Sequence, residues 1–251
     1  MPRIFLPQSF VADAIVALPA DAARHVQVLR LQPGQTIQLF NGGDGFDWSA
    51  QIVRIGRNAV DVRIGAAEAV DRELSCTVTL ALGVPANDRM DALVEKAGEL
   101  GATAIQPLVC ERSVLRFSAD RAEAKQRHWN AVAAAASEQC GRARVTDVLA
   151  VRSFASWLAS EAAAGAGRRI ILSFDPAAIA AASALRCDAA ARPESVLVLS
   201  GPEGGLSDGE ESAAVARGFV RVGLGPRVLR ADTAPLALLA WLGVRTTTAL
   251  R

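Results

Sequence analysis

The chain has no tyrosine and only two histidines, His25 and His128, among its 251 residues. So few histidines argue against a histidine-rich metal site, and we expect no metal. The four cysteines are spread along the whole chain without a Cys-x-x-Cys pair. We therefore expect reduced, mostly buried thiols in place of disulfides or a zinc site.

Long apolar runs are also missing. None reaches the roughly 18 residues that a membrane helix needs. The first six residues lack the apolar region of a signal peptide. These two absences predict a cytoplasmic protein that does not span a membrane.

A strong charge of one sign is absent too, because the net charge is only +1. The basic residues are nevertheless uneven: residues 112–152 carry eight Lys or Arg against four Asp or Glu, a local excess of +4. A polyanion such as RNA could dock on this segment. An ordinary solvated helix face explains the same charges equally well.

Residues 1–70 have the pattern of a small β-rich domain. A helix is expected at 21–31, and residues 65–74 resemble a polar linker. Short strands joined by tight turns favour a small barrel. The expected strands occupy residues 36–40, 46–54 and 59–64.

Residues 74–251 alternate short apolar runs with helical patterns, which is typical of an α/β domain with a mostly parallel sheet and helices on both sides. The alanine-rich residues 175–193 are ambiguous and most resemble a ragged helix. The other expected helices lie at 87–100, capped by Asp88, and at 119–141, 153–164, 208 onward and 235–244, the last being apolar nearly all round. The expected strands lie at 76–84, 104–109, 168–174, 195–199 and 219–223.

Two glycine-bearing loops follow the last two of these strands. The first glycine loop is residues 199–206, and the second glycine loop is residues 224–234. Glycine lets a backbone approach a ligand closely. Loops at the ends of neighbouring parallel strands form the usual ligand crevice of an α/β sheet. Ser207 and Glu210 have the spacing of a capping box, which predicts a helix directly after the first glycine loop.

The two loops do not fit the common nucleotide fingerprints. The first has neither the Gly-x-Gly-x-x-Gly pattern nor the Lys-Ser/Thr of a phosphate-binding loop. The second begins with Gly223 and Gly225, but Val228 stands where a third small residue is needed. NAD and ATP are therefore disfavoured. A Ser-His-Asp triad is also disfavoured, because neither histidine lies near a nucleophile elbow.

The residues of the two loops carry a resemblance. Leu-Ser-Gly-Pro-Glu-Gly-Gly-Leu-Ser at 199–207 and Leu-Gly-Pro-Arg-Val-Leu-Arg-Ala-Asp-Thr-Ala at 224–234 are similar to the paired signature of SPOUT-class RNA methyltransferases. Within that class they resemble the RsmE family, which methylates N3 of a uridine in small-subunit (16S) ribosomal RNA. Further matching blocks lie at 25–30, 95–101, 111–114 and 137–142. The departures are mild: Ala231 and Asp232 replace the usual Thr and Glu, Thr146 a frequent Pro, and Cys140 a usual Ser.

The resemblance implies a fold and partners that the residue patterns alone do not give. Residues 1–70 would form a PUA-like RNA-binding barrel. Residues 74–251 would form a SPOUT domain whose sheet is tied in a trefoil knot. The cofactor would be S-adenosylmethionine. The protein would act as a homodimer on ribosomal RNA or on the assembled small ribosomal subunit, with the knot and the last helix at the dimer interface.

The resemblance also implies site residues. Arg142 and Arg230 are the catalytic candidates, since a guanidinium could stabilise an anion developing on the uracil. The residues expected to bind the cofactor are Leu172, Leu199, Gly201, Pro202, Glu203, Gly204, Gly205, Leu224, Gly225, Val228, Leu229 and Thr233. The residues expected to bind RNA are Arg24, His25, Arg30, Arg112, Arg116, Glu138 and Gln139.

Several of these residues have simpler interpretations. Glu203 could be a turn residue only, and Glu138 could form a surface ion pair with Arg142 four residues later. Two alternative functions stay open at this point. One is a catalytically silent RNA-binding assembly factor that kept the fold, and the other is a ribose 2′-O RNA methyltransferase of the same class.

Overall fold

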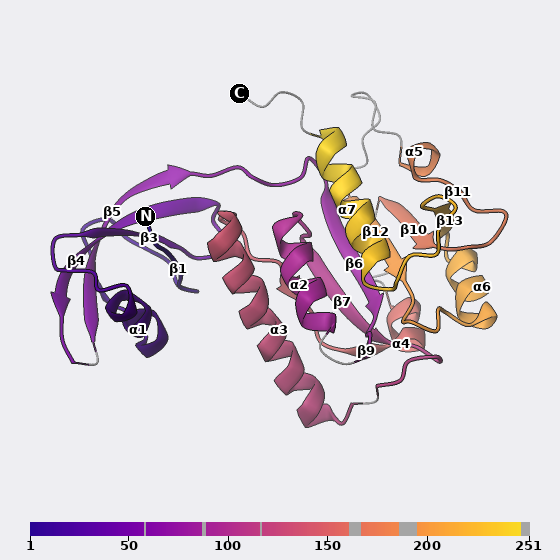
Figure 1. Ribbon diagram of the computed structural model, residues 1–251, viewed down its shortest axis with the longest axis horizontal. Coiled ribbons are helices and arrows are strands. Elements are labelled where there is room, and N and C mark those ends of the chain that lie inside the picture. The colour runs from indigo at the N-terminus through magenta and orange to yellow at the C-terminus, as the bar shows by residue number, and fades with distance from the viewer. Residues whose placement is uncertain (58, 87–88, 116, 161–166, 186–194, 247–251) are drawn as a thin grey trace. The chain divides into compact units, whose positions relative to one another are not determined.

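The computed structural model describes residues 1–57, 59–86, 89–115, 117–160, 167–185 and 195–246 (Figure 1). The chain divides into two compact units. Unit 1 is Met1–Arg72 together with Ser137–Val145, and unit 2 is Glu73–Ala136 together with Thr146–Arg251. Residues 137–145, expected in the C-terminal domain, are thus grouped with the N-terminal residues. The functional division at residues 70–74 stays a prediction.

Unit 1 is built on a five-stranded sheet in the order β1-β3-β4-β5-β2. Neighbouring strands are antiparallel except β1 and β3, which are parallel. No ladder between described residues joins β1 to β2, so closure into a barrel stays a prediction. The elements are β1 (Arg3–Phe5), β2 (Ile15–Ala17), α1 (Ala20–Val28), β3 (Thr36–Phe40), β4 (Phe46–Ile55) and β5 (Val60–Ala69).

The core of unit 1 follows the alternation of its strands. Ile37 and Leu39 on β3, and Val62 on β5, face inward and are fully buried. Strand β5 continues to Ala69, so the linker expected from residue 65 onward is wrong in its first part. Strands β1 and β2 were not predicted, because three residues are too few to show a period of two.

Unit 2 contains an eight-stranded sheet whose main path is β11-β13-β10-β12-β6-β7-β8, with β9 also paired to β7. Every ladder in it is parallel, which confirms the predicted α/β class. Its strands are β6 (Thr77–Gly83), β7 (Ala104–Val109), β8 (Asp147–Val148), β9 (Arg152–Ser153), β10 (Arg168–Leu172), β11 (Ile179–Ala180), β12 (Ser195–Ser200) and β13 (Val220–Gly223). Its helices are α2 (Arg89–Glu99), α3 (Ala119–Cys140, whose last residues belong to unit 1), α4 (Phe154–Ala159), α5 (Ala181–Ala184), α6 (Asp208–Ala216) and α7 (Thr233–Thr246).

Helices cover the strands of unit 2. Helix α7 packs on β12 and beside α2, while α4 packs on β7 and beside α6 (Figure 1). Leu197 and Leu199 of β12 join the buried cluster that contains Trp157 of α4. Val198, between them, is also fully buried. Central strands enclosed in this way read as continuous apolar runs.

Some expected helices differ in the structure. Helix α4 ends at Ala159, earlier than predicted. Residues 186–194 lie outside the described chain. In the described part of the predicted helix 175–193, the structure has β11 followed by the four-residue α5. The expected cap Asp88 also lies outside it. Helix α7 buries Leu238 and Leu242 but leaves Val244 79% exposed, so it is not buried all round.

Two findings concern the predictions that were based on the lack of long apolar runs and of closely spaced cysteines. None of the helices in the described part of the chain is long and apolar enough to cross a membrane. Cys76, Cys110 and Cys140 are not joined in disulfides, and the first two are buried. Cys187 falls outside the described residues.

Candidate functional site

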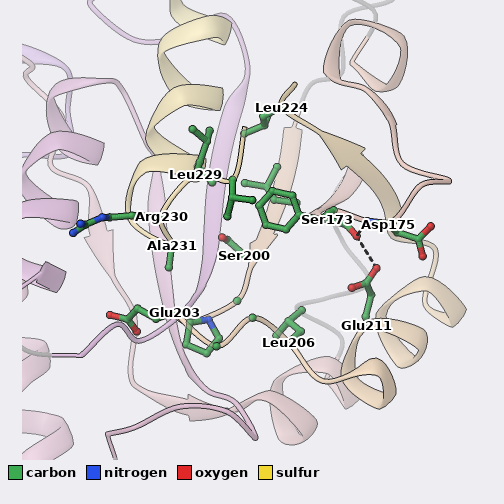
Figure 2. A pocket seen from close by; sticks show the side chains of 18 of the residues that line it. Ser173, Asp175, Ser200, Glu203, Leu206, Glu211, Leu224, Leu229, Arg230 and Ala231 are labelled. Carbon is green, nitrogen blue, oxygen red and sulfur yellow. Dashed lines mark hydrogen bonds between the residues drawn. The ribbon is translucent and has the colours of Figure 1, made fainter. Parts of the chain in front are cut away.

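A cavity of about 840 Å³ opens at the carboxyl ends of β10, β12 and β13 in unit 2 (Figure 2). This volume lies within the roughly 300–1,000 Å³ that is usual for small-molecule sites. The lining residues are Arg89, Arg112, 172–175, 200–206, Asp208, Glu211, Ser212, Arg221, Val222, Leu224, 227–231 and Ala234. The two glycine loops therefore line one cavity, as the sequence predicts. The expectation that they follow neighbouring strands is wrong, because β10 lies between β12 and β13.

The first glycine loop makes close backbone contacts that require glycine. A Cβ on Gly201 would lie 2.6 Å from the backbone nitrogen of Leu206. A Cβ on Gly83, at the end of β6, would overlap Pro202. Gly205 has a φ of +69°, a conformation that disfavours side chains. The glycines thus let the loop fold tightly against its neighbouring strand.

Arg112 holds this loop from the side. Its Nη1 donates to the carbonyl oxygens of Leu206 at 2.9 Å and Gly204 at 3.2 Å. Arg112 was predicted to contact RNA phosphates, and that contact stays a prediction. The structure gives part of its hydrogen-bonding capacity to the first glycine loop instead.

Glu203, whose side chain is labelled in Figure 2, also has a structural role. Its Oε1 accepts hydrogen bonds from the backbone nitrogen of Ala86 at 2.9 Å and from Arg89 Nη1 at 3.4 Å. These bonds connect the first glycine loop to Ala86, in the segment between β6 and α2, and to Arg89, the first residue of α2. Glu203 is therefore more than a turn residue.

The predicted capping box at the start of α6 is confirmed. Ser207 Oγ accepts from the Glu210 backbone nitrogen at 3.1 Å, and Glu210 Oε2 accepts from the Ser207 nitrogen at 3.0 Å. The other oxygen of Glu210 accepts from the backbone nitrogen of Glu111 at 2.9 Å. Helix α6 therefore begins at a fixed point directly after the first glycine loop.

One wall of the cavity is polar and was not predicted. Glu211 Oε1 accepts from Arg221 Nε at 2.6 Å and from Ser173 Oγ at 2.8 Å (Figure 2). Asp175 Oδ2 lies 3.5 Å from the same Arg221 nitrogen. The hydrogen bond to Glu211 raises the pKa of Arg221. No motif marks these residues, because they come from three elements that only the fold brings together.

Another part of the lining is apolar. Leu172, Leu224 and Leu229 lie within it, together with two unusually exposed side chains. These are Phe174, which is 69% exposed, and Val228, which is 82% exposed. Exposed apolar groups on a cavity wall suit a flat, partly apolar ligand.

Arg230 belongs to the second glycine loop and lines the cavity. In Figure 2 its side chain extends away from the wall that carries Asp175 and Glu211. Its carbonyl oxygen accepts from the nitrogens of Thr233 and Ala234, both at 3.0 Å, where α7 begins. The exposed guanidinium makes no hydrogen bond to any residue that the structure describes.

Some residues that were expected to bind the cofactor or to take part in catalysis are not among those that line this cavity. Leu199 faces the buried core cluster, and Thr233 is the first residue of α7. Gly225 lines an adjacent cavity of about 430 Å³. Arg142 belongs to unit 1 and is 3% exposed. The structure thus places Arg230, but not Arg142, among the residues that line the cavity of unit 2.

The structure also describes most of the residues that are expected to bind RNA. Arg24, His25 and Arg30 are exposed on or just after α1, and Gln139 is exposed near the end of α3. Glu138 Oε1 accepts from the backbone nitrogen of Phe5 at 2.7 Å, which gives this carboxylate a structural partner. Arg116 lies outside the described residues.

We searched the part of the chain that the structure describes for side chains that could bind a metal ion. There, no group of three or more His, Cys, Asp or Glu side chains could hold a metal ion.

Comparison with known proteins gives consistent matches. A family model described as an RNA methyltransferase domain matches residues 72–243, and one described as an RNA methyltransferase PUA domain matches residues 18–65. The chain is 32% identical to the ribosomal RNA small subunit methyltransferase E of Synechocystis, covering 95% of this chain and 76% of that protein. It is 30% identical to the protein of the same name from Bacillus subtilis, covering 88% and 86%. The crystal structure of the Neisseria gonorrhoeae ribosomal RNA small subunit methyltransferase E bound to S-adenosylmethionine superposes with a TM-score of 0.85 at 32% identity, covering 97% of each chain.

Proposed function

Because the chain belongs to the ribosomal RNA small subunit methyltransferase E (RsmE) family, we propose that it methylates N3 of a specific uridine in 16S ribosomal RNA. It is an S-adenosylmethionine-dependent ribosomal RNA methyltransferase. The single observation that carries the proposal is the cavity that the two glycine loops form in a chain of this family.

The residues of the cavity fit S-adenosylmethionine. The apolar side chains Leu172, Leu224 and Leu229 would hold the adenosine, and the tight first glycine loop would offer backbone groups to it. The carboxylates of Asp175 and Glu211 suit hydroxyl or ammonium groups of a ligand that carries a sulfonium charge. When bound, the cofactor supplies an activated methyl group.

The protein has to supply orientation and electrostatic stabilisation. Uridine N3 carries a weakly acidic proton and becomes a good nucleophile only as that proton leaves. Arg230, exposed on the cavity wall, would stabilise the negative charge that then develops on the uracil carbonyl oxygens. We retain Arg142 as a second candidate, although its side chain is buried in unit 1.

RNA would be bound by several parts of the chain. Arg24, His25, Arg30 and Gln139 of unit 1 are exposed and would contact the RNA. The target base would have to be unpaired or flipped out to reach the cofactor. With no tyrosine in the chain, Phe174 at the cavity is a suitable side chain for stacking on it.

The remaining expectations belong to the same proposal. We propose a homodimer with α7 at its interface, and the exposed Val244 supports this role for the helix. We further propose that the sheet of unit 2 is knotted as in SPOUT enzymes, and that the protein acts in the cytoplasm on naked RNA or on assembled small subunits.

The decisive experiment compares 16S ribosomal RNA from a strain lacking the gene with RNA from the parent strain. Nucleoside digestion and mass spectrometry should show loss of one N3-methyluridine, restored by the purified protein with S-adenosylmethionine. Retention of that nucleoside would refute the proposal. Loss of a 2′-O-methylated nucleoside would favour the ribose methyltransferase, and RNA binding without cofactor binding or methyl transfer would favour the silent assembly factor.

A further inference from the structure

The guanidinium of Arg3 is held in one orientation inside unit 1. Its Nε donates to Asp47 Oδ2 at 3.0 Å and its Nη2 to Asp47 Oδ1 at 2.6 Å, which makes a bidentate pair. The two side chains are only 10% and 8% exposed. The guanidinium carbon lies 4.2 Å from the ring centroid of Phe40. A planar fork that is paired and stacked in this way has little freedom to rotate.

The remaining donors of Arg3 bind the carboxyl end of α3. Nη1 donates to the carbonyl oxygen of Ser137 at 2.8 Å and, at 3.5 Å, to that of Glu138. Nη2 donates to the carbonyl oxygen of Arg142 at 3.1 Å. The Ser137 carbonyl oxygen already accepts from the Gly141 nitrogen at 3.1 Å, so Arg3 adds a second hydrogen bond to it. A cation at the carboxyl end of a helix also complements the helix dipole. Every N–H group of the guanidinium therefore has an acceptor.

Other contacts fix the same segment, residues 137–145. Glu138 Oε1 accepts from the Phe5 nitrogen at 2.7 Å, so β1 holds the segment through a backbone group as well. At the far end of the segment, the Val145 nitrogen donates to Gly42 O at 3.1 Å and Arg144 Nη1 donates to Gly43 O at 3.0 Å. The segment is thus held by β1 and by the turn after β3, while Asp47 of β4 fixes the Arg3 side chain that binds it.

We propose that Arg3 is a positioning residue for RNA methylation. It fixes the path of residues 137–145 and thereby orients Gln139 and Arg142, without touching RNA or cofactor itself. The proposal rests on the proposed function, because these two residues are the ones expected to serve RNA binding and catalysis. Misplacing such groups by about 1 Å can lower a rate by roughly a hundredfold.

The test uses the full-length protein with Arg3→Lys, which keeps a cation opposite Asp47 but loses the fork. The matched control is Arg54→Lys, because Arg54 pairs with Asp61 at 2.7 Å in the same unit. Hydrogen exchange, the affinity for S-adenosylmethionine, and methyl transfer to small-subunit particles are measured for each. If Arg3→Lys does not fold, the double variant Arg3→Gln/Asp47→Asn is used in its place, because it removes both charges of the pair together.

We expect Arg3→Lys to speed amide exchange in residues 138–145 and to lower kcat/KM for RNA about tenfold. The affinity for S-adenosylmethionine should change less than about twofold, and Arg54→Lys should change none of these quantities. In an Arg142→Ala background the effect of Arg3→Lys on the rate should largely disappear, because coupled residues are not additive.

Three results would overturn the proposal. Faster exchange with an unchanged rate would make Arg3 purely structural, and unchanged exchange would show that Arg3 does not hold the segment. If the affinity for S-adenosylmethionine fell as much as kcat/KM for RNA, Arg3→Lys would have loosened the whole protein and not residues 137–145 alone. If the unsubstituted protein transfers no methyl group, the proposed function fails; the role of Arg3 is then judged on RNA affinity, and equal RNA affinity of Arg3→Lys refutes it.

Discussion

Arg112 donates from its Nη1 to the carbonyl oxygen of Leu206 at 2.9 Å, across 94 residues of sequence. The same nitrogen reaches Gly204 O at 3.2 Å. A surface arginine that the sequence suggests for RNA phosphates is therefore a support for the first glycine loop. This relationship separates two roles that can be measured independently, cofactor affinity and RNA affinity.

Arg112→Ala should weaken S-adenosylmethionine binding by roughly tenfold, because hydrogen bonds from a charged group contribute about 1.5–3 kcal/mol and this side chain is partly exposed. Isothermal titration calorimetry measures the change. The control is Arg127→Ala, whose guanidinium pairs with the exposed Glu123 at 3.8 Å on the surface of α3. A loss of RNA affinity with unchanged cofactor affinity would contradict the supporting role.

Gly201→Ala should destabilise the protein by about 1–3 kcal/mol, as overpacking usually does. The added Cβ would lie 2.6 Å from the Leu206 nitrogen, so the loop must shift. Gly209→Ala is the matched control, because Gly209 is exposed in α6 and its Cβ would lie 3.7 Å from Ser207 Oγ. That change should leave the free energy of unfolding unchanged or slightly higher, because alanine has a higher helix propensity than glycine and the site has room for a methyl group. Urea unfolding of both variants measures the difference, and equal stabilities would refute the close-contact explanation.

The sequence predicts the position of the two glycine loops well, because both signals are local. Apolar runs indicate the buried strands, and glycines indicate the tight turns that follow them. It also predicts the parallel sheet of unit 2, since each central strand is a continuous apolar run. It does not predict the polar wall, because Ser173, which follows β10, meets Glu211 of α6 and Arg221 of β13 only in the folded chain. Nor does it predict that residues 137–145 join unit 1, since the partners of the segment, Arg3 among them, lie far away in the sequence. Local residue patterns thus predict the helices and strands. They do not predict which unit a segment such as residues 137–145 joins, because that involves hydrogen bonds to residues far away in the sequence.

Glu211→Gln should weaken S-adenosylmethionine binding several-fold. The carboxylate accepts from both Arg221 and Ser173, and a neutral amide accepts more weakly and places an NH₂ group near the guanidinium. Glu99→Gln is a suitable control, since Glu99 pairs with Lys96 on the surface of α2. Calorimetric titration of both variants gives the comparison. Equal affinities would remove the polar wall from the cofactor site.

Arg230→Ala should lower turnover at least tenfold, while the affinity for S-adenosylmethionine changes by less than about twofold. The reason is that its exposed guanidinium lines the cavity without a described protein partner, so it is available to stabilise charge on the substrate. Single-turnover methyl transfer measures the rate, calorimetry the affinity, and light scattering the oligomeric state, which should be unchanged. Arg230→Lys should recover only part of the rate, because a single ammonium cannot reproduce the two-pronged geometry. Arg217→Ala, at the exposed end of α6, serves as the surface control. Near-normal turnover of Arg230→Ala would exclude Arg230 from the reaction and leave the charge on the uracil to be stabilised by another group.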